Sequence, residues 1–291
     1  MKNILICLMI LCLCVGCNEV EIEENTNNET VIEEQQEQEE VVVEEPKEEV
    51  KEEKEPEILV EEDTNKLDNK TIGWYFMKGK DHARSTFGKE LTTPADKYGA
   101  IYLMPEEGNK IYLTFDEGYE NGYTGQILDT LKEKNVKAIF FITGPYLNKE
   151  KELIQRMVDE GHQVGNHTIN HPSLPSLSDK KVEDEVLDLD RKFYEEFGKP
   201  MKYLRPPMGE FSERTLSITK SLGYTNVFWS FAYRDWETDN QKGKDYAYNT
   251  VINALHPGEV MLLHAVSKDN AEALGDIIDT AREMGYEFGE L

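Results

Sequence analysis

The sequence predicts an α/β fold built on a parallel sheet, with a barrel favoured over an open sheet. From Lys110 onward, short apolar runs alternate with amphipathic segments of helical period, which is the pattern of strands joined by crossover helices. The first run, Ile111–Phe115, is apolar enough for a strand buried on both faces. No Gly-rich phosphate-binding turn follows this strand, and its absence disfavours an open nucleotide-binding sheet.

The elements are expected to follow one another in a regular order. The helix expected at 178–197 shows the clearest period, because apolar residues from Val182 to Phe197 fall on one stripe. Glycine and proline residues mark most of the other boundaries. We expect strands at 111–117, 138–143, 163–168, 202–204, 225–230 and 259–263, and helices at 123–134, 148–161, 178–197, 212–222, 244–255 and 267–284.

Charge is spread unevenly along the 291 residues, whose formal net charge is -26. Residues 19–63 hold 21 Asp and Glu against 3 Lys, a net of -18. Once the single Lys2 is allowed for, residues 64–291 carry only -9, which is ordinary for a soluble domain. No basic patch or alternation of basic and aromatic residues appears, so we expect no nucleic-acid partner.

The first 17 residues predict a lipoprotein-type signal segment. A short apolar run follows Lys2, and residues 13–17, LCVGC, resemble a bacterial lipobox in which Cys17 is lipidated. Cys14 stands where that motif usually has leucine, so a cleaved signal or an uncleaved anchor is the alternative. We therefore expect an extracytoplasmic protein, anchored to the membrane through Cys17 or else secreted. All four cysteines lie in this segment, which excludes thiol chemistry from the folded part.

Three further segments follow the signal. Residues 18–70 are rich in Glu and nearly free of aromatic residues, which predicts a disordered acidic tether, with a helical stalk as the alternative. Residues 71–109 are rich in aromatic residues without a clean period and are expected to form an N-terminal extension that packs on the main fold. Residues 110–291 are expected to be the catalytic domain.

Polar side chains recur where the expected strands end. The carboxyl ends of strands in a parallel barrel converge on one mouth, so such residues are expected to lie together. Scattered polar residues would not recur at these positions, and the pattern predicts a catalytic site. The residues are Asp116 and Glu117 after the first strand, His167 and His171 after the third, Arg205 after the fourth, Asp235 after the fifth and His264 at the end of the sixth.

Each of these residue types has a chemical use and a plainer structural one. Two imidazoles and a carboxylate suit a metal site with open positions, although His167 and His171 taken alone would also suit a loop. Arg205 stands beside two prolines, which suits a guanidinium that holds a carboxylate with two parallel hydrogen bonds. A turn with a surface arginine is the structural alternative. Trp236 next to an aspartate suits stacking against a sugar, or a place in the core. His264 suits a proton donor or a satisfied core histidine.

Five motifs in order resemble the polysaccharide deacetylase family, the fourth carbohydrate esterase family. The resemblance covers about 110–288 and implies a deformed, incomplete (β/α) barrel. Four more stretches, at 118–124, 240–248, 256–258 and 266–274, are similar to the spore-cortex branch, the muramic δ-lactam-forming de-N-acetylases. The five motifs are TFDEG at 114–118, HTINH at 167–171, RPPMG at 205–209, DW at 235–236 and LLH at 262–264.

The resemblance implies a role for each matching residue. It implies a divalent metal, with zinc expected first and cobalt, manganese or nickel as alternatives. Most of the family has an aspartate ligand where this chain has Glu117, so the third ligand is the doubtful one. The implied roles are Asp116 as base, His264 as acid, Arg205 orienting the base, Asp235 tuning the acid, His167, His171 and Glu117 on the metal, and Trp236, Leu262, Tyr119 and Pro207 on the substrate.

The implied activity is metal-dependent removal of N-acetyl groups from peptidoglycan sugars. The branch resemblance favours N-acetylmuramic acid and formation of the δ-lactam of the spore cortex. Alternatives are an N-acetylglucosamine or chitin-oligomer deacetylase, and a glycan-binding lipoprotein without catalysis because of Glu117. A third is a metal-independent hydrolase with Asp116 and Glu117 as its acid–base pair. We expect peptidoglycan strands as the partner and a monomeric protein.

Overall fold

The structure is a computed structural model that describes residues 63–291. The signal segment expected at 1–17 and the tether as far as residue 62 lie outside the described residues. Within the described part, none of the helices combines the length and the apolar character needed to cross a bilayer.

A curled parallel sheet forms the centre of the domain, as the sequence predicts. The strand order is β7-β5-β4-β3-β2-β8, and β9 pairs with the start of β2. All of the ladders in this sheet are parallel. The strands are β2 (Lys110–Glu117), β3 (Ile139–Ile142), β4 (Gln163–Asn166), β5 (Tyr203–Leu204), β7 (Thr225–Asn226), β8 (Glu259–His264) and β9 (Glu287–Phe288).

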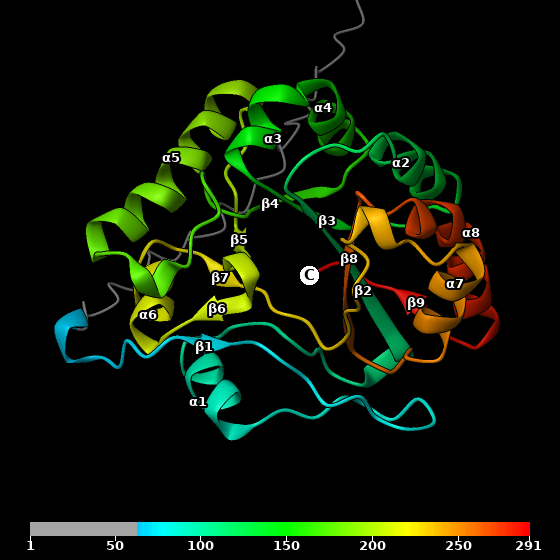
Figure 1. The fold of residues 1–291 in the computed structure, drawn as a ribbon, viewed down its shortest axis with the longest axis horizontal. Coiled ribbons are helices and arrows are strands. Elements are labelled where there is room, and N and C mark those ends of the chain that lie inside the picture. Colours follow the sequence, from blue (N-terminus) through cyan, green and yellow to red (C-terminus); the bar gives the residue numbers. More distant parts are fainter. Residues whose placement is uncertain (1–62) are drawn as a thin grey trace, which may run out of the picture. The chain divides into compact units, whose positions relative to one another are not determined.

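Helices cover the outer face of the sheet and leave one side of the ring to the N-terminal extension (Figure 1). The end strands β7 and β8 do not pair with each other in the described chain, so the expected incomplete barrel is confirmed. A single bridge between Phe231 and Met261 joins the segment after β7 to β8. The helices are α1 (Lys89–Lys97), α2 (Thr124–Glu133), α3 (Gly144–Lys149), α4 (Lys151–Asp159), α5 (Asp179–Phe197), α6 (Glu213–Ser221), α7 (Lys244–Ile252) and α8 (Lys268–Glu283).

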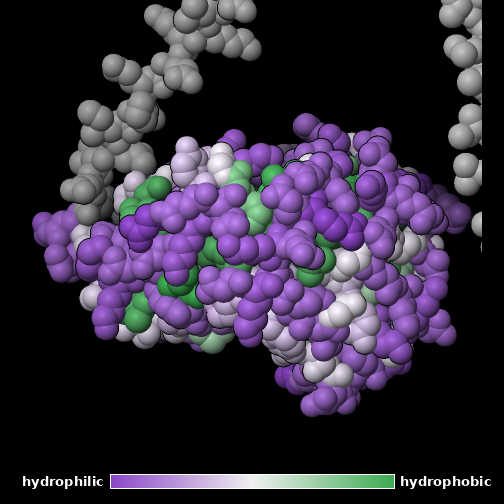
Figure 2. All heavy atoms as spheres, turned by 90° about the horizontal axis from the view of Figure 1, so that it is seen from above, coloured by the Kyte–Doolittle hydropathy of each residue, from purple (hydrophilic) through white to green (hydrophobic). Residues whose placement is uncertain are grey.

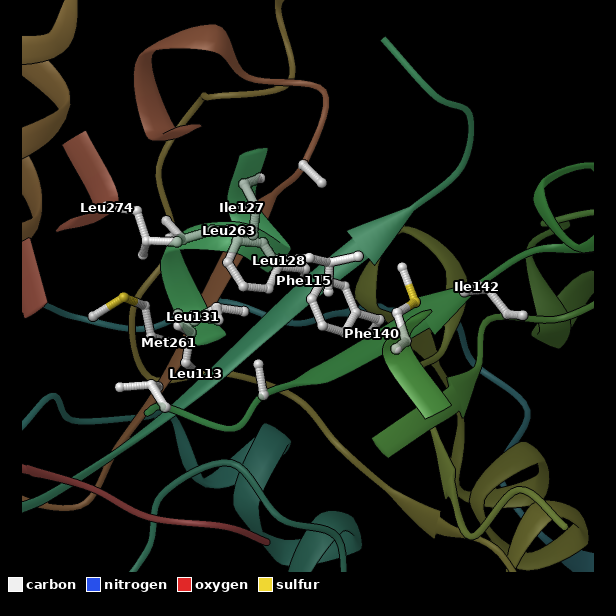
Figure 3. Close-up of a cluster of buried hydrophobic side chains, with 14 of the residues drawn as sticks. Leu113, Phe115, Ile127, Leu128, Leu131, Phe140, Ile142, Met261, Leu263 and Leu274 are labelled. Atoms are coloured by element: carbon white, nitrogen blue, oxygen red, sulfur yellow. The ribbon is translucent and has the colours of Figure 1, made fainter. Parts of the chain in front are cut away.

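The main core lies between the sheet and helices α2 and α8 (Figure 3). Phe115 of β2 stacks on Phe140 of β3 with ring centroids 5.1 Å apart, and both side chains are fully buried. Complete burial of an apolar side chain of this size contributes about 1.5–3 kcal/mol. Phe115 directly precedes Asp116, so packing of the core fixes the end of β2 from which the site is built.

The helix expected at 148–161 corresponds to α4, and the structure adds the short helix α3 before it. Gly144 and Pro145 begin α3 directly after β3, because proline is favoured in the first turn of a helix. Glu150 then leaves helical geometry, with φ -116° and ψ 38°, and α4 starts at the next residue.

The aromatic extension packs on the barrel through a second cluster of buried side chains. The ring of Trp74 stacks on Phe228 with centroids 4.3 Å apart, and its Nε1 donates to the carbonyl of Trp229 across 2.8 Å. The extension also contains β1 (Ile72–Gly73), which pairs antiparallel with β6 (Glu210–Phe211), and the helix α1, neither of which was expected. Because α1 is short and contains a proline, its sequence lacks a helical signal.

Residues 63–70, which the sequence analysis assigned to the tether, contact the folded domain. The carbonyl of Asp68 accepts a hydrogen bond from the amide of Arg214 at the start of α6, across 3.1 Å. Asn69 Nδ2 donates to the carbonyl of Pro175 across 3.0 Å. The segment is polar, and it docks by hydrogen bonds rather than by apolar burial. Composition, which reports apolar content, therefore could not distinguish it from a solvated spacer.

The helices that lie along the top of Figure 1 present a mostly hydrophilic face, seen in Figure 2. Apolar residues appear on it only in separate small patches. Scattered exposed apolar residues are normal for a protein surface and indicate no interface on this face.

Candidate active site

A cavity of about 820 Å³ opens at the carboxyl ends of the sheet strands. Its wall includes Asp116 at the end of β2, His264 at the end of β8, and His167 and His171 after β4. Asp116 and His264 are register partners in the parallel ladder between β2 and β8. The structure therefore brings strand-end residues that are remote in sequence to one mouth.

Asp116 is held by a buried arginine. Arg205 Nη1 donates to Asp116 Oδ1 across 2.7 Å, and the guanidinium is inaccessible to solvent. Burial alone would raise the pKa of this carboxyl, but the electrostatic interactions of its neighbours, led by the charge of Arg205, outweigh burial and lower it. Asp116 is thus ionised at neutral pH, although only 7% of its surface is exposed.

The remaining donors of Arg205 are also satisfied inside the barrel. Its Nη2 donates to Thr114 Oγ1 across 2.8 Å, and its Nε donates to the carbonyl of Val227 across 3.1 Å. The guanidinium carbon lies 4.2 Å from the centroid of the Phe141 ring. Burying a charge is tolerated only when its partners satisfy it this fully, so the fork holds Asp116 in one orientation.

His167 and His171 face each other at the mouth. Their Nε2 atoms are 3.1 Å apart, and their rings meet edge to face with centroids 4.6 Å apart. His167 is buried, whereas His171 lies at the exposed rim. The expected strand-to-loop geometry of this pair is what the structure shows.

Two residues of left-handed backbone bend the loop that carries His171. Thr168 has φ 67° and His171 has φ 59°, which are uncommon for residues other than glycine. Asn166 supports the bend, because its Oδ1 accepts from the Thr168 amide across 2.8 Å and its Nδ2 donates to the carbonyl of Val186 in α5. The strain turns His171 back toward His167.

The two histidines are neutral at physiological pH. Burial lowers the pKa of His167 to about 4, and burial also lowers that of His171. The Nδ1 of His167 lies 2.8 Å from the carbonyl of Arg205. A carbonyl only accepts, so this Nδ1 carries the proton and the Nε2 of His167 keeps its lone pair.

Glu117 lies apart from the two histidines. Its position does not suit the role of third metal ligand, which the sequence left in doubt. Its side chain is fully buried and is absent from the cavity wall, and its Oε1 accepts from Thr124 Oγ1 of α2 across 3.4 Å. Among residues 63–291, the other oxygen, Oε2, meets no hydrogen-bond partner. Burial, and then the charge of Glu120, raise the pKa of Glu117 well above its ordinary value. Successive strand residues point to opposite faces, so Asp116 and Glu117 cannot act as an acid–base pair in one cavity.

Asp235 holds His264 by two hydrogen bonds. His264 Nδ1 lies 2.7 Å from Asp235 Oδ1, and the backbone amide of His264 donates to Asp235 Oδ2 across 2.7 Å. Burial alone would lower the pKa of His264, but the buried carboxylate of Asp235 outweighs burial and raises it. His264 therefore binds its second proton more strongly than an ordinary histidine does, and Nε2 is the ring nitrogen that Asp235 does not engage.

Asn270 is a part of this arrangement that sequence reasoning missed. Its Nδ2 donates to Asp235 Oδ2 across 2.6 Å, and its Oδ1 accepts from the hydroxyl of Tyr233. The stretch at 266–274 was recognised as a branch-level match, but nothing in it indicated a contact with Asp235. Asn270 lies in the first turns of α8, and only the docking of that helix brings it to the site.

Three of the four expected substrate residues line the cavity and one does not. Tyr119, Trp236 and Leu262 are part of its wall, and the ring of Trp236 lies 5.3 Å from that of His264. Pro207 is buried outside the wall, which corrects its assignment to substrate binding. The turn after Pro207 has left-handed backbone, and it presents Met208 and Gly209 to the cavity instead.

The histidine pair is the part of the site that fits a metal ion. Among residues 63–291, no group of three or more His, Cys, Asp or Glu is arranged to hold one. The two neutral imidazoles nevertheless turn their Nε2 atoms toward each other, and Asp116 Oδ2 lies 3.5 Å from His167 Nε2. Imidazole and carboxylate are the donors of zinc and similar divalent ions, so the donor set fits the implied metal.

Comparison with known proteins identifies the family of this chain. The family model "Polysaccharide deacetylase" matches residues 104–227. The chain is 47% identical over 223 residues to the peptidoglycan-N-acetylmuramic acid deacetylase PdaA of Bacillus subtilis, covering 76% of this chain and 85% of the relative. It is 33% identical over 190 residues to a peptidoglycan-N-acetylglucosamine deacetylase of Bacillus cereus, covering 64% and 87%.

A solved structure shows the same fold. The Bacillus subtilis PdaA structure, described as a family 4 carbohydrate esterase, matches with a TM-score of 0.75 and 46% identity, covering 77% of this chain and 96% of that one. The family resemblance given by the five motifs is therefore confirmed, and the similarity to PdaA agrees with the further likeness given by the four other stretches. With a relative this similar over most of its length, the chain belongs to the polysaccharide deacetylase family.

Proposed function

We propose that this protein removes the N-acetyl group from N-acetylmuramic acid in peptidoglycan. The class of enzyme, a carbohydrate de-N-acetylase, follows from the family. The choice of sugar is supported by the likeness to PdaA. The observation that carries the catalytic part is that Asp116 and His264 face one cavity with pKa values shifted in opposite directions.

Asp116 is the general base. Its Oδ1 is occupied by Arg205, which leaves Oδ2 toward the histidine pair and the cavity. As water attacks the acetamide carbonyl, Asp116 takes one proton from it, and Arg205 keeps the carboxylate in place and ionised beforehand. General base catalysis of this kind contributes roughly 10²–10⁴-fold to the rate.

His264 is the general acid. An amide anion is a poor leaving group, so the nitrogen must receive a proton as the C–N bond breaks. Asp235 holds the imidazolium through Nδ1 and directs Nε2 to the substrate. The products are acetate and a free amine, and the proton taken by Asp116 balances the one given by His264.

His167 and His171 would hold the divalent metal, for which zinc is the first choice. A bound divalent ion polarises the carbonyl and lowers the pKa of bound water. The carbonyl of Arg205 fixes the tautomer of His167 and so keeps a lone pair on Nε2 for the ion. We do not include Glu117 in this site, because its carboxyl faces α2.

The product of this reaction fits the formation of muramic δ-lactam. The released amine lies on the same sugar as the lactyl carboxyl group, and condensation between them, with loss of one water molecule, yields the lactam of the spore cortex. The similarity of stretches 118–124, 240–248, 256–258 and 266–274 to that branch supports a role in sporulation.

We further propose that the protein works outside the cytoplasm as a lipoprotein. Peptidoglycan lies beyond the membrane, and residues 13–17 resemble a lipobox with Cys17 as the lipidated residue. A secreted form without lipid is the alternative. The acidic segment 18–62 would act as a tether that lets the monomeric domain, which begins at residue 63, reach the wall.

The test is mass spectrometry of glycan strands after incubation with the purified protein, scoring acetyl loss on each sugar. We expect loss from muramic acid in strands stripped of peptide, with one acetate released per event and with activity abolished by a chelator and restored by zinc. Loss from N-acetylglucosamine alone would favour the alternative deacetylase. Glycan binding without acetate under any metal would favour a binding protein, and activity that survives chelation would favour a metal-independent hydrolase.

A further inference from the structure

Arg234 stands at the rim of the active-site cavity. Among the described residues that line the cavity, Arg234 is the only arginine, and none is a lysine. Its side chain is 79% exposed, and its Nη1 lies 3.7 Å from Glu237 Oε1, a loose surface contact. Such exposed pairs contribute little and are easily exchanged, so the guanidinium is available to an incoming ligand.

The other arginine near the site cannot serve an anion. Arg205 has no exposed surface, and its nitrogen atoms are engaged by Asp116, Thr114 and a backbone carbonyl. Residues 64–291 also carry a net charge of -9, which repels an anionic glycan. An anionic substrate therefore needs a local positive charge at the mouth, and Arg234 supplies it.

The backbone places Arg234 beside the general acid. The next residue, Asp235, holds His264 through Nδ1, and Trp236 packs its ring 5.3 Å from the His264 ring. A substrate whose leaving nitrogen is at His264 thus has its neighbouring atoms near this short segment. In muramic acid the acetamido group is on C2 and the lactyl ether is on C3, the adjacent carbon. N-acetylglucosamine has only a hydroxyl at C3.

We propose that Arg234 binds the lactyl carboxylate and makes the site selective for muramic acid over N-acetylglucosamine. This inference rests on the proposed function. A guanidinium matches a carboxylate with two parallel hydrogen bonds, which gives direction as well as charge. Arg234 is therefore a specificity-determining residue and not part of the proton transfers. Because the group is exposed, its contribution falls as salt concentration rises.

The first test is a binding measurement that does not depend on turnover. Peptide-free glycan strands and the same strands with methyl-esterified lactyl groups are titrated into chelator-treated protein by calorimetry. We expect the wild type to bind the free acid about tenfold more tightly than the ester, as for one charge-assisted contact. Arg234→Gln should bind both forms equally, and Arg234→Lys should keep part of the preference.

Arg191→Gln is the matched control, because Arg191 is an exposed arginine paired with Asp188 on the outer helix α5. It should keep the wild-type preference. Thermal unfolding of each variant shows whether the fold is kept, and Arg234→Lys provides a charge-retaining variant if Arg234→Gln is unstable. Equal preference for the free acid in Arg234→Gln and the wild type would overturn the inference.

Acetate release with the metal-loaded protein separates this result from the proposed function. With the free acid, Arg234→Gln should raise KM about tenfold with little change in kcat, and with the ester the two proteins should be alike. Wild-type protein that prefers the acid in binding but releases no acetate would refute the proposed function and leave the role of Arg234 supported. If the Arg234→Gln variant turned over muramic acid as the wild type does, the proposed function would be supported and the role of Arg234 would be refuted.

Discussion

Arg205 Nη1 meets Asp116 Oδ1 across 2.7 Å inside the barrel, where the guanidinium has no exposure to solvent. This contact joins the segment after β5 to the end of β2, so it ties the Asp116 carboxylate to a part of the sheet that β3 and β4 separate from β2. A buried pair of this kind adds little to stability by itself. Its consequence is a fixed, ionised base at the mouth of the cavity.

Asp116→Asn should abolish most of the activity and keep the cavity. The amide cannot take a proton from water, so kcat should fall by roughly 10²–10⁴-fold. Acetate release under saturating substrate measures it. Asp245→Asn, a change of the same kind at an exposed position of α7, is the control and should stay within about twofold of the wild type. A rate for Asp116→Asn near that of the control would remove Asp116 from the role of base.

Arg205→Lys should move the acid limb of the pH profile upward. Asp116 works as the carboxylate, so activity is lost as pH falls through its pKa, which Arg205 helps to lower. Lysine cannot reproduce the fork that holds both Asp116 and Thr114, and the pKa of Asp116 should rise. The variant should lose more activity near pH 5 than near pH 7 when kcat/KM is followed against pH. An unmoved acid limb would contradict this.

Asp235→Asn should move the basic limb downward. His264 must be protonated to act as the acid, so activity is lost as pH rises through its pKa, which Asp235 raises. Without the carboxylate that pKa falls, and kcat at neutral pH should drop by about 10²-fold. Asn270→Ala should shift the limb by much less, because it removes one donor to Asp235 and leaves the charge of the carboxylate in place. Profiles of kcat against pH for the two variants test this prediction. A basic limb that stays in place in both would contradict the proposal that Asp235 raises the pKa of His264.

Glu117→Gln should leave metal binding almost unchanged. The carboxyl is buried against α2 with a raised pKa, so an amide of equal size replaces it closely. We expect the metal affinity to change by less than about threefold, against a loss of at least about 100-fold in His171→Ala. Titration of the metal-free protein with zinc measures both. A large loss in Glu117→Gln would return Glu117 to the ligand set.

The same substitution should change the pH dependence of stability. The folded state holds the Glu117 proton more tightly than the unfolded state, so the free energy of unfolding falls as pH rises above the ordinary glutamate pKa. Glu117→Gln has no proton to lose and should be the more stable protein at neutral and alkaline pH. Denaturant unfolding at several pH values shows whether the difference grows with pH, as this account requires.

Trp74→Ala should destabilise the domain by about 3–5 kcal/mol. The ring is buried against Phe228, and its Nε1 donates to the carbonyl of Trp229, which lines the cavity. Tyr75→Ala, at the adjacent and exposed position, should cost less than about 1 kcal/mol. Urea unfolding of both variants gives the comparison. Similar losses in the two would mean that the extension is not part of the fold.

The sequence by itself determined the fold class, the family and the residues at the strand ends. Alternation of strand and helix predicts a parallel sheet, and a parallel sheet gathers its carboxyl ends. Asp116 and His264 could therefore be placed at one mouth from their positions after apolar runs. These properties depend on local periodicity and on topology, which a chain records in its order of residues.

Only the tertiary structure decided which way the side chains of the site face. Both faces of β2 are buried, so the sequence could not tell that Asp116 enters the cavity while Glu117 turns to α2. The left-handed backbone at His171 and the contact of Asn270 with Asp235 likewise depend on packing between distant segments. Orientation within a strand end is set by how neighbouring elements dock, because both orientations satisfy the same local pattern of burial.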